Sequence, residues 1–385
     1  MAVRPVPPRW ANLDIDLVTE IMNRAPCVID RARMAAVCQA WLEAVARAEP
    51  LTFQLPSLLL PPADVTGVYC YLSGFRDHNM FPGPRYFGSY DGGWFFLAYG
   101  QTRGHRLFNI RTGESYELPD GLADIFTNDI HSMVVLAATL SFPPHHPGCA
   151  AAGIVTYQPD LDAPRQRHFA FWRPGDRMAV CDVVPAVPIE PGLEPEDVVY
   201  YRDSFHFLTQ GGHILVCSPI FDGEGHIPGA LLELMRFQEA WCTDEQFVRA
   251  RYLVVSRGEL LVVVRLAAHH HAPTSSFKVF RVILKSKTCR FEEVALCGRM
   301  LFLGRGCSRS YEVSQYPGFK DSIFFLDDRS FYDDAEMMFG GVNERQYPCN
   351  DIGRWSPEGL LPSHVEFYFP ERVPSYNSPP AWLLP

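Results

Sequence analysis

One stretch of the sequence, Gly304-Arg305-Gly306-Cys307, has the glycine-rich composition of a loop that cradles phosphate groups. Such a loop needs free backbone N–H groups and a helix that begins directly after it. This stretch lacks a third glycine, and the residues on either side have the pattern of strands. The sequence therefore favours a turn between strands over a nucleotide site.

Histidines and aspartates cluster at four other places. His269-His270-His271 and His145-His146 could bind a metal, but no cysteine or carboxylate stands at ligand spacing from them, which favours exposed loops. Asp327-Asp328 and Asp333-Asp334 could act as paired acids, but acids after a strand are more often solvated turn residues. Nucleophile-elbow, zincin and Walker motifs do not occur. We therefore predict no catalytic residue, no metal and no cofactor, and a chain that is not an enzyme.

The composition excludes further classes of function. The chain has 385 residues, 47% of them hydrophobic, which suits one small module and one large globular domain. A net charge of −10 gives no basic field for nucleic acid. The 11 cysteines contain no Cys-x-x-Cys pair, so we expect small buried side chains in a reducing compartment.

Nothing in the sequence predicts a membrane segment. The most apolar stretch, Tyr252 to Ala268, is interrupted by charged residues, and residues 1–8 are rich in proline and have no apolar core of the kind that a secretory signal needs. We expect a soluble protein of the cytoplasm, the nucleus or both, with neither membrane nor nucleic acid as a partner.

The elements that would position a site begin with a helical segment, residues 9–48. Apolar residues recur there at helical spacing, as in Leu17, Val18, Ile21 and Met22. Asp14 or Asp16 can cap a first helix, and Asp30 a second, with Trp41 in a third. Three short helices with large apolar residues at several angles expose more apolar surface than they can bury. The segment is thus either a docking module or a cap packed on the following domain.

Residues 52–385 have the pattern of an all-β domain. Short apolar or alternating runs are separated by Gly, Pro, Asn and Asp, with Met337–Gly341 among the later runs. Only Leu231–Met235 and Thr243–Ala250 look helical. A loose repeat of hairpins predicts a β-propeller of about six or seven blades. The ring would be closed by an N-terminal strand, either Leu51–Leu55 or Val68–Tyr71.

The helical segment resembles a known motif. Its residues read Trp10-x-x-Leu13-x-x-Asp16-Leu17-Val18-x-x-Ile21, followed by Val37-Cys38-x-x-Trp41. This is very similar to the F-box, which binds a Skp-type adaptor in SCF ubiquitin ligases, although Leu13-Asp14 stands where the family usually has Leu-Pro. By resemblance, the module's core and adaptor face comprise Leu13, Leu17, Val18, Ile21, Val37, Cys38 and Trp41. The sequence does not divide these residues between the two roles.

The all-β part resembles the plant KIB-type β-propeller family. The similarity rests on stretches such as Gly88-Ser89-Tyr90-Asp91-Gly92-Gly93-Trp94 near its beginning and Ile323-Phe324-Phe325-Leu326-Asp327-Asp328 in its later part. That family typically carries an N-terminal F-box, so the two resemblances agree.

Together the resemblances imply a substrate-recognition subunit of an SCF-type ubiquitin ligase. The F-box would dock to a Skp-type adaptor and through it to a cullin, while the propeller would bind a target protein. Two alternatives remain open: a propeller enzyme or small-ligand binder whose helices are only a cap, and a decoy receptor that has lost adaptor binding.

Overall fold

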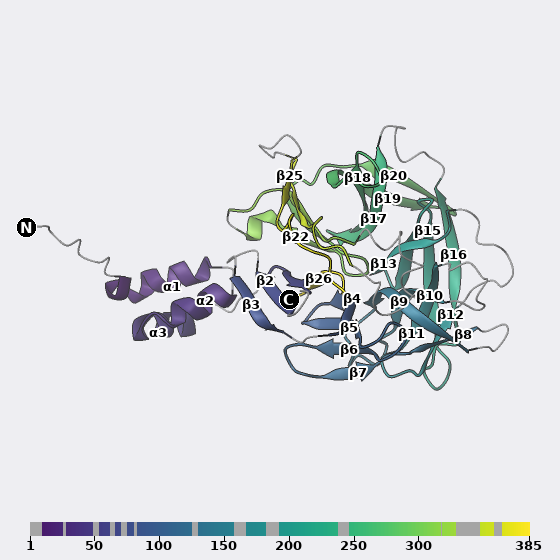
Figure 1. Cartoon of the computed structure of the whole chain (residues 1–385), viewed down its shortest axis with the longest axis horizontal. Coiled ribbons are helices and arrows are strands. Elements are labelled where there is room, and N and C mark those ends of the chain that lie inside the picture. Colours follow the sequence, from purple (N-terminus) through teal and green to yellow (C-terminus); the bar gives the residue numbers. More distant parts are fainter. Residues whose placement is uncertain are drawn as a thin grey trace, which may run out of the picture.

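The computed structural model describes residues 10–25, 28–48, 54–61, 66–70, 75–80, 83–124, 130–157, 167–181, 192–237, 246–316, 318–328, 347–357 and 364–385. A 3-10 turn and three short helices come first, and every later element that the structure describes is a strand except one 3-10 turn. Figure 1 shows the helices to one side and the sheets following one another around a ring. The predicted strand Met337–Gly341 and the acidic pair Asp333-Asp334 lie outside the described residues.

The helical part consists of a 3-10 turn, Trp10–Asn12, and of α1 (Ile15–Asn23), α2 (Val28–Ala35) and α3 (Gln39–Arg47). Asp14 caps α1, because its carboxylate accepts a hydrogen bond from the backbone N–H of Asp16 over 2.8 Å. Asp30 lies inside the first turn of α2 and not before it, so its predicted role as a cap is wrong.

The helices enclose a small core of their own. Val18, Met22, Trp41 and Ala44 are buried and contact one another. The partly buried apolar residues around them also belong to the helical segment. Within the described part of the chain, this core therefore contains no strand residue.

The described strands form five hydrogen-bonded sheets. The first contains β1 (Ser57–Leu60), β2 (Thr66–Cys70), β3 (Phe75–Met80) and β26 (Ala381–Leu383), and the second contains β4 (Arg85–Tyr90), β5 (Trp94–Ala98), β6 (His105–Asn109) and β7 (Ser115–Glu117). The third, which closes on itself, contains β8 (Gly121–Asp124), β9 (Ile130–Leu140), β10 (Ala151–Tyr157), β11 (Arg167–Trp172) and β12 (Met178–Cys181).

The fourth sheet has eight strands and divides into two antiparallel groups. One group is β13 (Pro195–Tyr201), β14 (Ser204–Thr209), β15 (Ile214–Ile220) and β16 (Gly229–Phe237), and the other is β17 (Phe247–Ser256), β18 (Glu259–Ala267), β19 (Thr274–Lys285) and β20 (Thr288–Glu293). Among the described strands, the only ladder that joins the two groups is the short parallel pairing of Arg236 and Phe237 with Thr288 and Cys289.

The fifth sheet has the order β22-β21-β23-β24-β25. Its strands are β21 (Arg299–Leu303), β22 (Arg309–Glu312), β23 (Ser322–Phe325), β24 (Gly353–Trp355) and β25 (Val365–Phe367), with a 3-10 turn at Val313–Gln315. β21 and β23 run parallel, so this sheet departs from the simple meander of the second one.

The first and last strands of the ring pair with each other. β26 runs antiparallel to β1, with Leu58 opposite Trp382. The buried Trp382 indole N–H donates to the Leu303 carbonyl over 2.7 Å, which ties this first sheet to β21. An N-terminal strand thus closes the ring as predicted, but that strand is Ser57–Leu60. Where the structure describes them, the predicted segments do not pair with β26: Gln54 and Leu55 are not strand, and β2 lies beyond β1. Residues 51–53 and 71 lie outside the described residues.

The two segments predicted to be helical are wrong where the structure describes them. Leu231–Met235 lies in β16, which pairs with β15 from Gly229 to Met235. Residues 247–250 begin β17. Leu, Glu and Met favour helix intrinsically, but a ladder with a neighbouring strand outweighs a propensity of a few tenths of a kcal/mol per residue. Among the described helices, none is long and apolar enough to cross a bilayer.

Candidate functional site

An apolar face lies exposed on the helices. Leu17 and Ile21 are one turn apart on α1 and therefore project from the same side of it. Leu17 is 57% exposed and Ile21 is 41% exposed, while Val37, in the link between α2 and α3, is 54% exposed. We call these three residues the helical apolar face. Large aliphatic side chains of this kind, gathered on one small module, are typical of a surface that a partner covers.

The other predicted site residues lie inside the module. Val18 is fully buried, and Trp41 is 8% exposed. The Trp41 indole N–H donates to the Trp10 carbonyl over 3.1 Å, so it also holds the turn before α1. Leu13 and Cys38 are partly buried against this core. The seven residues thus divide into four that build the module and three that face outward.

Two further exposed apolar residues, Trp10 and Leu42, were not among the predicted site residues. Trp10 was part of the sequence motif, but nothing in its spacing separated an exposed indole from a buried one. Leu42 lies beside Trp41 on α3, and only the packing of α3 against α1 shows that it points away from the core.

The ring begins close to the helices. Gln54 accepts hydrogen bonds from the Arg111 guanidinium over 3.3 Å and, at its carbonyl, from the Tyr316 hydroxyl over 3.5 Å. Leu55 is buried in the core that contains Tyr316 and Trp382. These contacts fix the start of the ring at the junction of the first, second and fifth sheets.

A second candidate site is a cavity of about 70 Å³ at the centre of the ring. It is lined by Arg85 on β4, Leu136 on β9 and Ala381 on β26, together with Arg305, Asp328 and Tyr347 from loops. The lining therefore brings together segments that are up to about 300 residues apart in the chain. The cavity is large enough only for a very small molecule or a single side chain.

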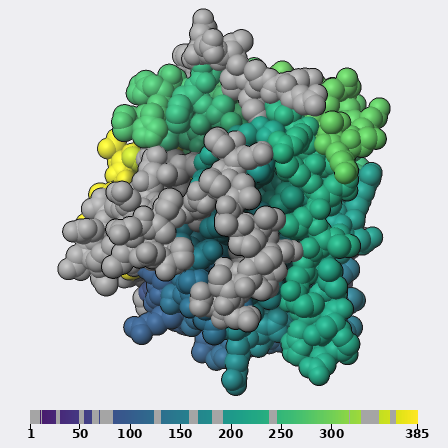
Figure 2. Space-filling model, turned by 90° about the vertical axis from the view of Figure 1, so that its right-hand side faces the viewer, coloured from purple at the N-terminus to yellow at the C-terminus, as the bar shows by residue number. Residues whose placement is uncertain are grey.

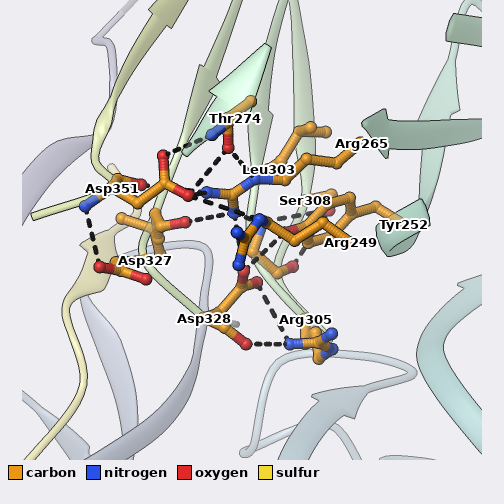
Figure 3. A network of polar contacts seen from close by, with 12 residues as sticks. Arg249, Tyr252, Arg265, Thr274, Leu303, Arg305, Ser308, Asp327, Asp328 and Asp351 are labelled. Carbon is orange, nitrogen blue, oxygen red and sulfur yellow. Dashed lines mark hydrogen bonds and ion pairs between the residues drawn. The ribbon is translucent and has the colours of Figure 1, made fainter. Parts of the chain in front are cut away.

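A buried ion-pair network lies beside the cavity (Figure 3). The guanidinium of Arg265, on β18, is fully buried and pairs with Asp351 over 2.9 Å and with Asp328 over 3.0 Å. It also donates to the Leu326 carbonyl over 2.7 Å. Asp327 is fully buried and accepts the backbone N–H of Asp351 over 2.8 Å. The network joins β18 to the loops that follow β23.

Asp327-Asp328 is therefore not a solvated pair, and that prediction is wrong. Asp328 is also within 3.5 Å of the Arg305 guanidinium. Carboxylates that arginines hold inside a protein act as structural anchors, since removing one partner strands a buried charge. Hydrolysis by paired acids would need carboxyl groups free to contact a substrate, and here both are engaged by partners within the protein.

Asp197, at the start of β13, links three sheet segments through one carboxylate. It accepts backbone N–H groups from Val198 over 2.8 Å, from Leu253 over 2.7 Å and from Gly306 over 2.6 Å. Burial raises the pKa of Asp197 to about 7, although the three donors favour the ionised form and act against that rise. The carboxylate thus holds β17 and the 304–307 loop against β13.

The 304–307 loop is a buried turn and not a phosphate cradle. Three of its four backbone donors are already occupied: the Gly306 N–H by Asp197, the Cys307 N–H by the Gly304 carbonyl and the Gly304 N–H by the Ser308 hydroxyl. Gly306 has a φ of +71°, and a side chain there would come within 2.5 Å of the Ala138 carbonyl oxygen. The turn that the sequence favoured is present, but it passes through the ring centre.

The remaining candidates agree with their sequence interpretation. His269-His270-His271 and His145-His146 are exposed. Among the described residues, no three His, Cys, Asp or Glu side chains are placed to hold a metal ion. Of the cysteines whose side chains are described, five are buried; Cys38 is partly buried and Cys297 is exposed. Burial raises the pKa of Cys307 and of Cys349, to about 12 and about 11, which keeps both thiols protonated.

Mainly antiparallel sheets that follow one another around a ring, with the first and last strands paired, are typical of the β-propeller class. The sequence agrees with this assignment. Residues 67–355 match the family described as KIB1-4 beta-propeller, and the chain belongs to that family.

Other comparisons add little. No curated protein matches the chain. A solved structure with some similarity is that of the major Malassezia sympodialis allergen Mala s 1, which is 10% identical and has a TM-score of 0.25. The match covers 63% of this chain and 82% of that one.

Proposed function

We propose that this chain is the substrate-recognition subunit of an SCF-type ubiquitin ligase. The helical module is an F-box that docks to a Skp-type adaptor and through it to a cullin. The propeller, which we take to have six blades, binds the target protein. The single observation that carries the proposal is the helical apolar face: Leu17, Ile21 and Val37 stay exposed although the module already has a closed core.

The described sheets support a count of six blades. The eight-stranded sheet supplies two of them, because its halves share only the short pairing of β16 with β20. The other four sheets supply one blade each. The chain itself makes and breaks no bond in this role; tethering raises the effective concentration of the target near the ubiquitin-charged enzyme.

The alternatives are less well supported. A propeller enzyme needs titratable groups that converge on an open cavity, whereas the carboxylate that lines the central cavity, Asp328, is engaged by Arg265 and Arg305. A decoy receptor would have the same fold and would differ only in its affinity for the adaptor. A measurement of adaptor binding therefore distinguishes the ligase subunit from the enzyme and from the decoy receptor.

The test is a pull-down of a purified Skp-type adaptor by the full chain. We expect the wild type to retain the adaptor and the Leu17→Asp/Ile21→Asp variant to lose it, since each carboxylate would be buried without a partner. The control is Leu231→Asp on β16, where a leucine of the propeller that is 68% exposed gains one carboxylate. Failure of the wild type to bind, or binding by the α1 double variant, would contradict the proposal.

A further inference from the structure

The cationic residues of this chain are divided very unequally. The sequence contains 30 arginines and only 4 lysines. The lysines are Lys278, Lys285, Lys287 and Lys320, so residues 1–277 and 321–385 contain none. Lysine is ordinarily among the commonest residues of a globular protein. Nearly every position where a surface lysine would serve is thus occupied by arginine or by an uncharged residue.

Buried ion pairs explain only part of the excess of arginine. Arg265 and Arg305 need a planar guanidinium, since each donates to several acceptors at once. Arg103 and Arg177, by contrast, are exposed in turns of the second and third sheets, where a lysine would be equally soluble. The two side chains differ there in one chemical respect. Lysine has a primary amine that can be acylated, and arginine does not.

The lysines are confined to the last third of the chain. Lys278 lies in β19 and is half-buried, and Lys320 is exposed before β23. Lys285 is the last residue of β19 and Lys287 is the second residue of the turn that joins β19 to β20, and both are exposed. Figure 1 places β19 and β20 away from the helices, and the green part of the chain to which they belong forms the upper surface in Figure 2.

The β19–β20 turn holds its two lysines in a defined position. Ser286 and Lys287 have φ values of +41° and +67°, as a tight hairpin turn requires. The Thr288 hydroxyl donates to the Lys285 carbonyl over 2.7 Å, and the Arg236 backbone N–H donates to the Lys287 carbonyl over 3.0 Å. Among the described residues, no carboxylate lies within ion-pair distance of either ammonium group.

We propose that the Lys285–Lys287 turn is the site at which this chain is itself ubiquitinated, and that the absence of lysine from residues 1–277 protects the rest of it. The inference rests on the proposed function. A receptor in an assembled ligase is held beside the ubiquitin-charged enzyme throughout, so every exposed amine on it competes with the target. Two exposed lysines in one anchored turn concentrate that competition at one place.

The chemistry is an acyl transfer. The deprotonated Nζ of Lys285 or Lys287 attacks the thioester carbonyl that joins the ubiquitin C-terminus to the cysteine of the conjugating enzyme. The new C–N isopeptide bond forms as the C–S bond breaks, the thiolate leaves with the electron pair, and the amine proton passes to solvent. No oxidant, metal or nucleotide is needed at this step, because the thioester supplies the energy.

The test is a reconstituted ligase reaction without target protein, using the full chain, a Skp-type adaptor, a cullin complex and ubiquitin-charged conjugating enzyme. The conjugates are mapped on all four lysines by mass spectrometry, and adaptor retention is measured in the same sample. We expect modification of Lys285, Lys287 or both, and loss of most self-conjugates in the Lys285→Arg/Lys287→Arg variant. The Lys278→Arg/Lys320→Arg variant is the matched control and should keep them.

A third variant tests whether the absence of lysine from residues 1–277 protects that part of the chain from ubiquitination. Arg103→Lys in the Lys285→Arg/Lys287→Arg background should restore self-conjugates, now at position 103. If the adaptor is retained but conjugates persist in the double variant or map to Lys320, the inference is overturned and the proposed function is not. If the adaptor is not retained and no conjugate forms, the result contradicts both the inference and the proposed function.

Discussion

Truncating the side chains of the helical apolar face to alanine should weaken adaptor binding. The expected loss can be worked out from the exposed fraction of each side chain, since that is the surface a partner would cover. Leu17→Ala and Ile21→Ala each remove three carbons, and Val37→Ala removes two. At ~0.8 kcal/mol per buried carbon, scaled by exposures of 57%, 41% and 54%, the losses are about 1.4, 1.0 and 0.9 kcal/mol. Together they predict that the triple variant binds the adaptor about two hundredfold more weakly.

The measurement is isothermal titration calorimetry of the full chain with purified adaptor. Leu231→Ala is the control, because this leucine of β16 is 68% exposed and loses the same three carbons. Its affinity should equal that of the wild type, and the circular dichroism of all variants should be unchanged, since none of these side chains belongs to a core. A triple variant that binds as tightly as the wild type, or a control that is weakened equally, would refute the assignment of this face.

Three further predictions concern the parts that support the site. Trp41→Ala should destabilise the helical module by ~3–5 kcal/mol, seen as faster hydrogen exchange in α1 and α3 with the strands unaffected. Arg265→Met should lower the free energy of unfolding by ~3–5 kcal/mol, because it leaves two aspartates without their partner. With an entropy of unfolding of ~0.7 kcal/mol per kelvin for roughly 330 residues, the calorimetric Tm should fall by about 4–7 °C. The control Arg281→Met, at a half-exposed ion pair, should barely change the Tm. Burial, assisted by the charge of Arg85, lowers the pKa of His105 to about 4, so between pH 6.5 and 4 the unfolded chain binds a proton that the folded chain does not. The contribution of His105 to the free energy of unfolding therefore falls as the pH drops from 6.5 to 4. In the His105→Phe variant, the Tm should depend less steeply on pH over this range.

Much of the fold was predictable because short apolar or alternating runs are separated by turn residues. β6 is an example, with buried and half-buried residues alternating from His105 to Asn109. The closing strand β1 was not among the predicted strands. Leu58, Leu59 and Leu60 are all buried, so β1 has no polar face and its sequence reads as a plain apolar run. The pairing of β1 with β26 joins opposite ends of the chain, and no local pattern encodes it.

The residues of the helical module were predictable as a set, but their division was not. Leu17 and Val18 are adjacent and both apolar, and they project about 100° apart on α1. Which of them is covered depends on where α3 packs, and that is set by Trp41, more than twenty residues further along the chain. Periodicity locates an apolar surface, whereas only tertiary contact separates the part that the module buries from the part that it leaves to a partner.

The ring centre reverses what local sequence suggests about charge. Asp327-Asp328 was predicted to be solvated, yet Asp328 pairs with the Arg265 guanidinium of β18. The Gly304–Cys307 turn is held by its own donors, since the Arg305 guanidinium donates to the Asp328 carbonyl and the Gly306 N–H donates to the Asp197 carboxylate. Arginine suits this task, because one side chain spans several acceptors on different elements. The same argument does not extend to the surface, where Arg103 and Arg177 make no such bridge among the described residues. A structural need for arginine at the centre therefore leaves the shortage of lysine on the outside unexplained, and competition for acyl transfer in an assembled ligase is a pressure that would act there.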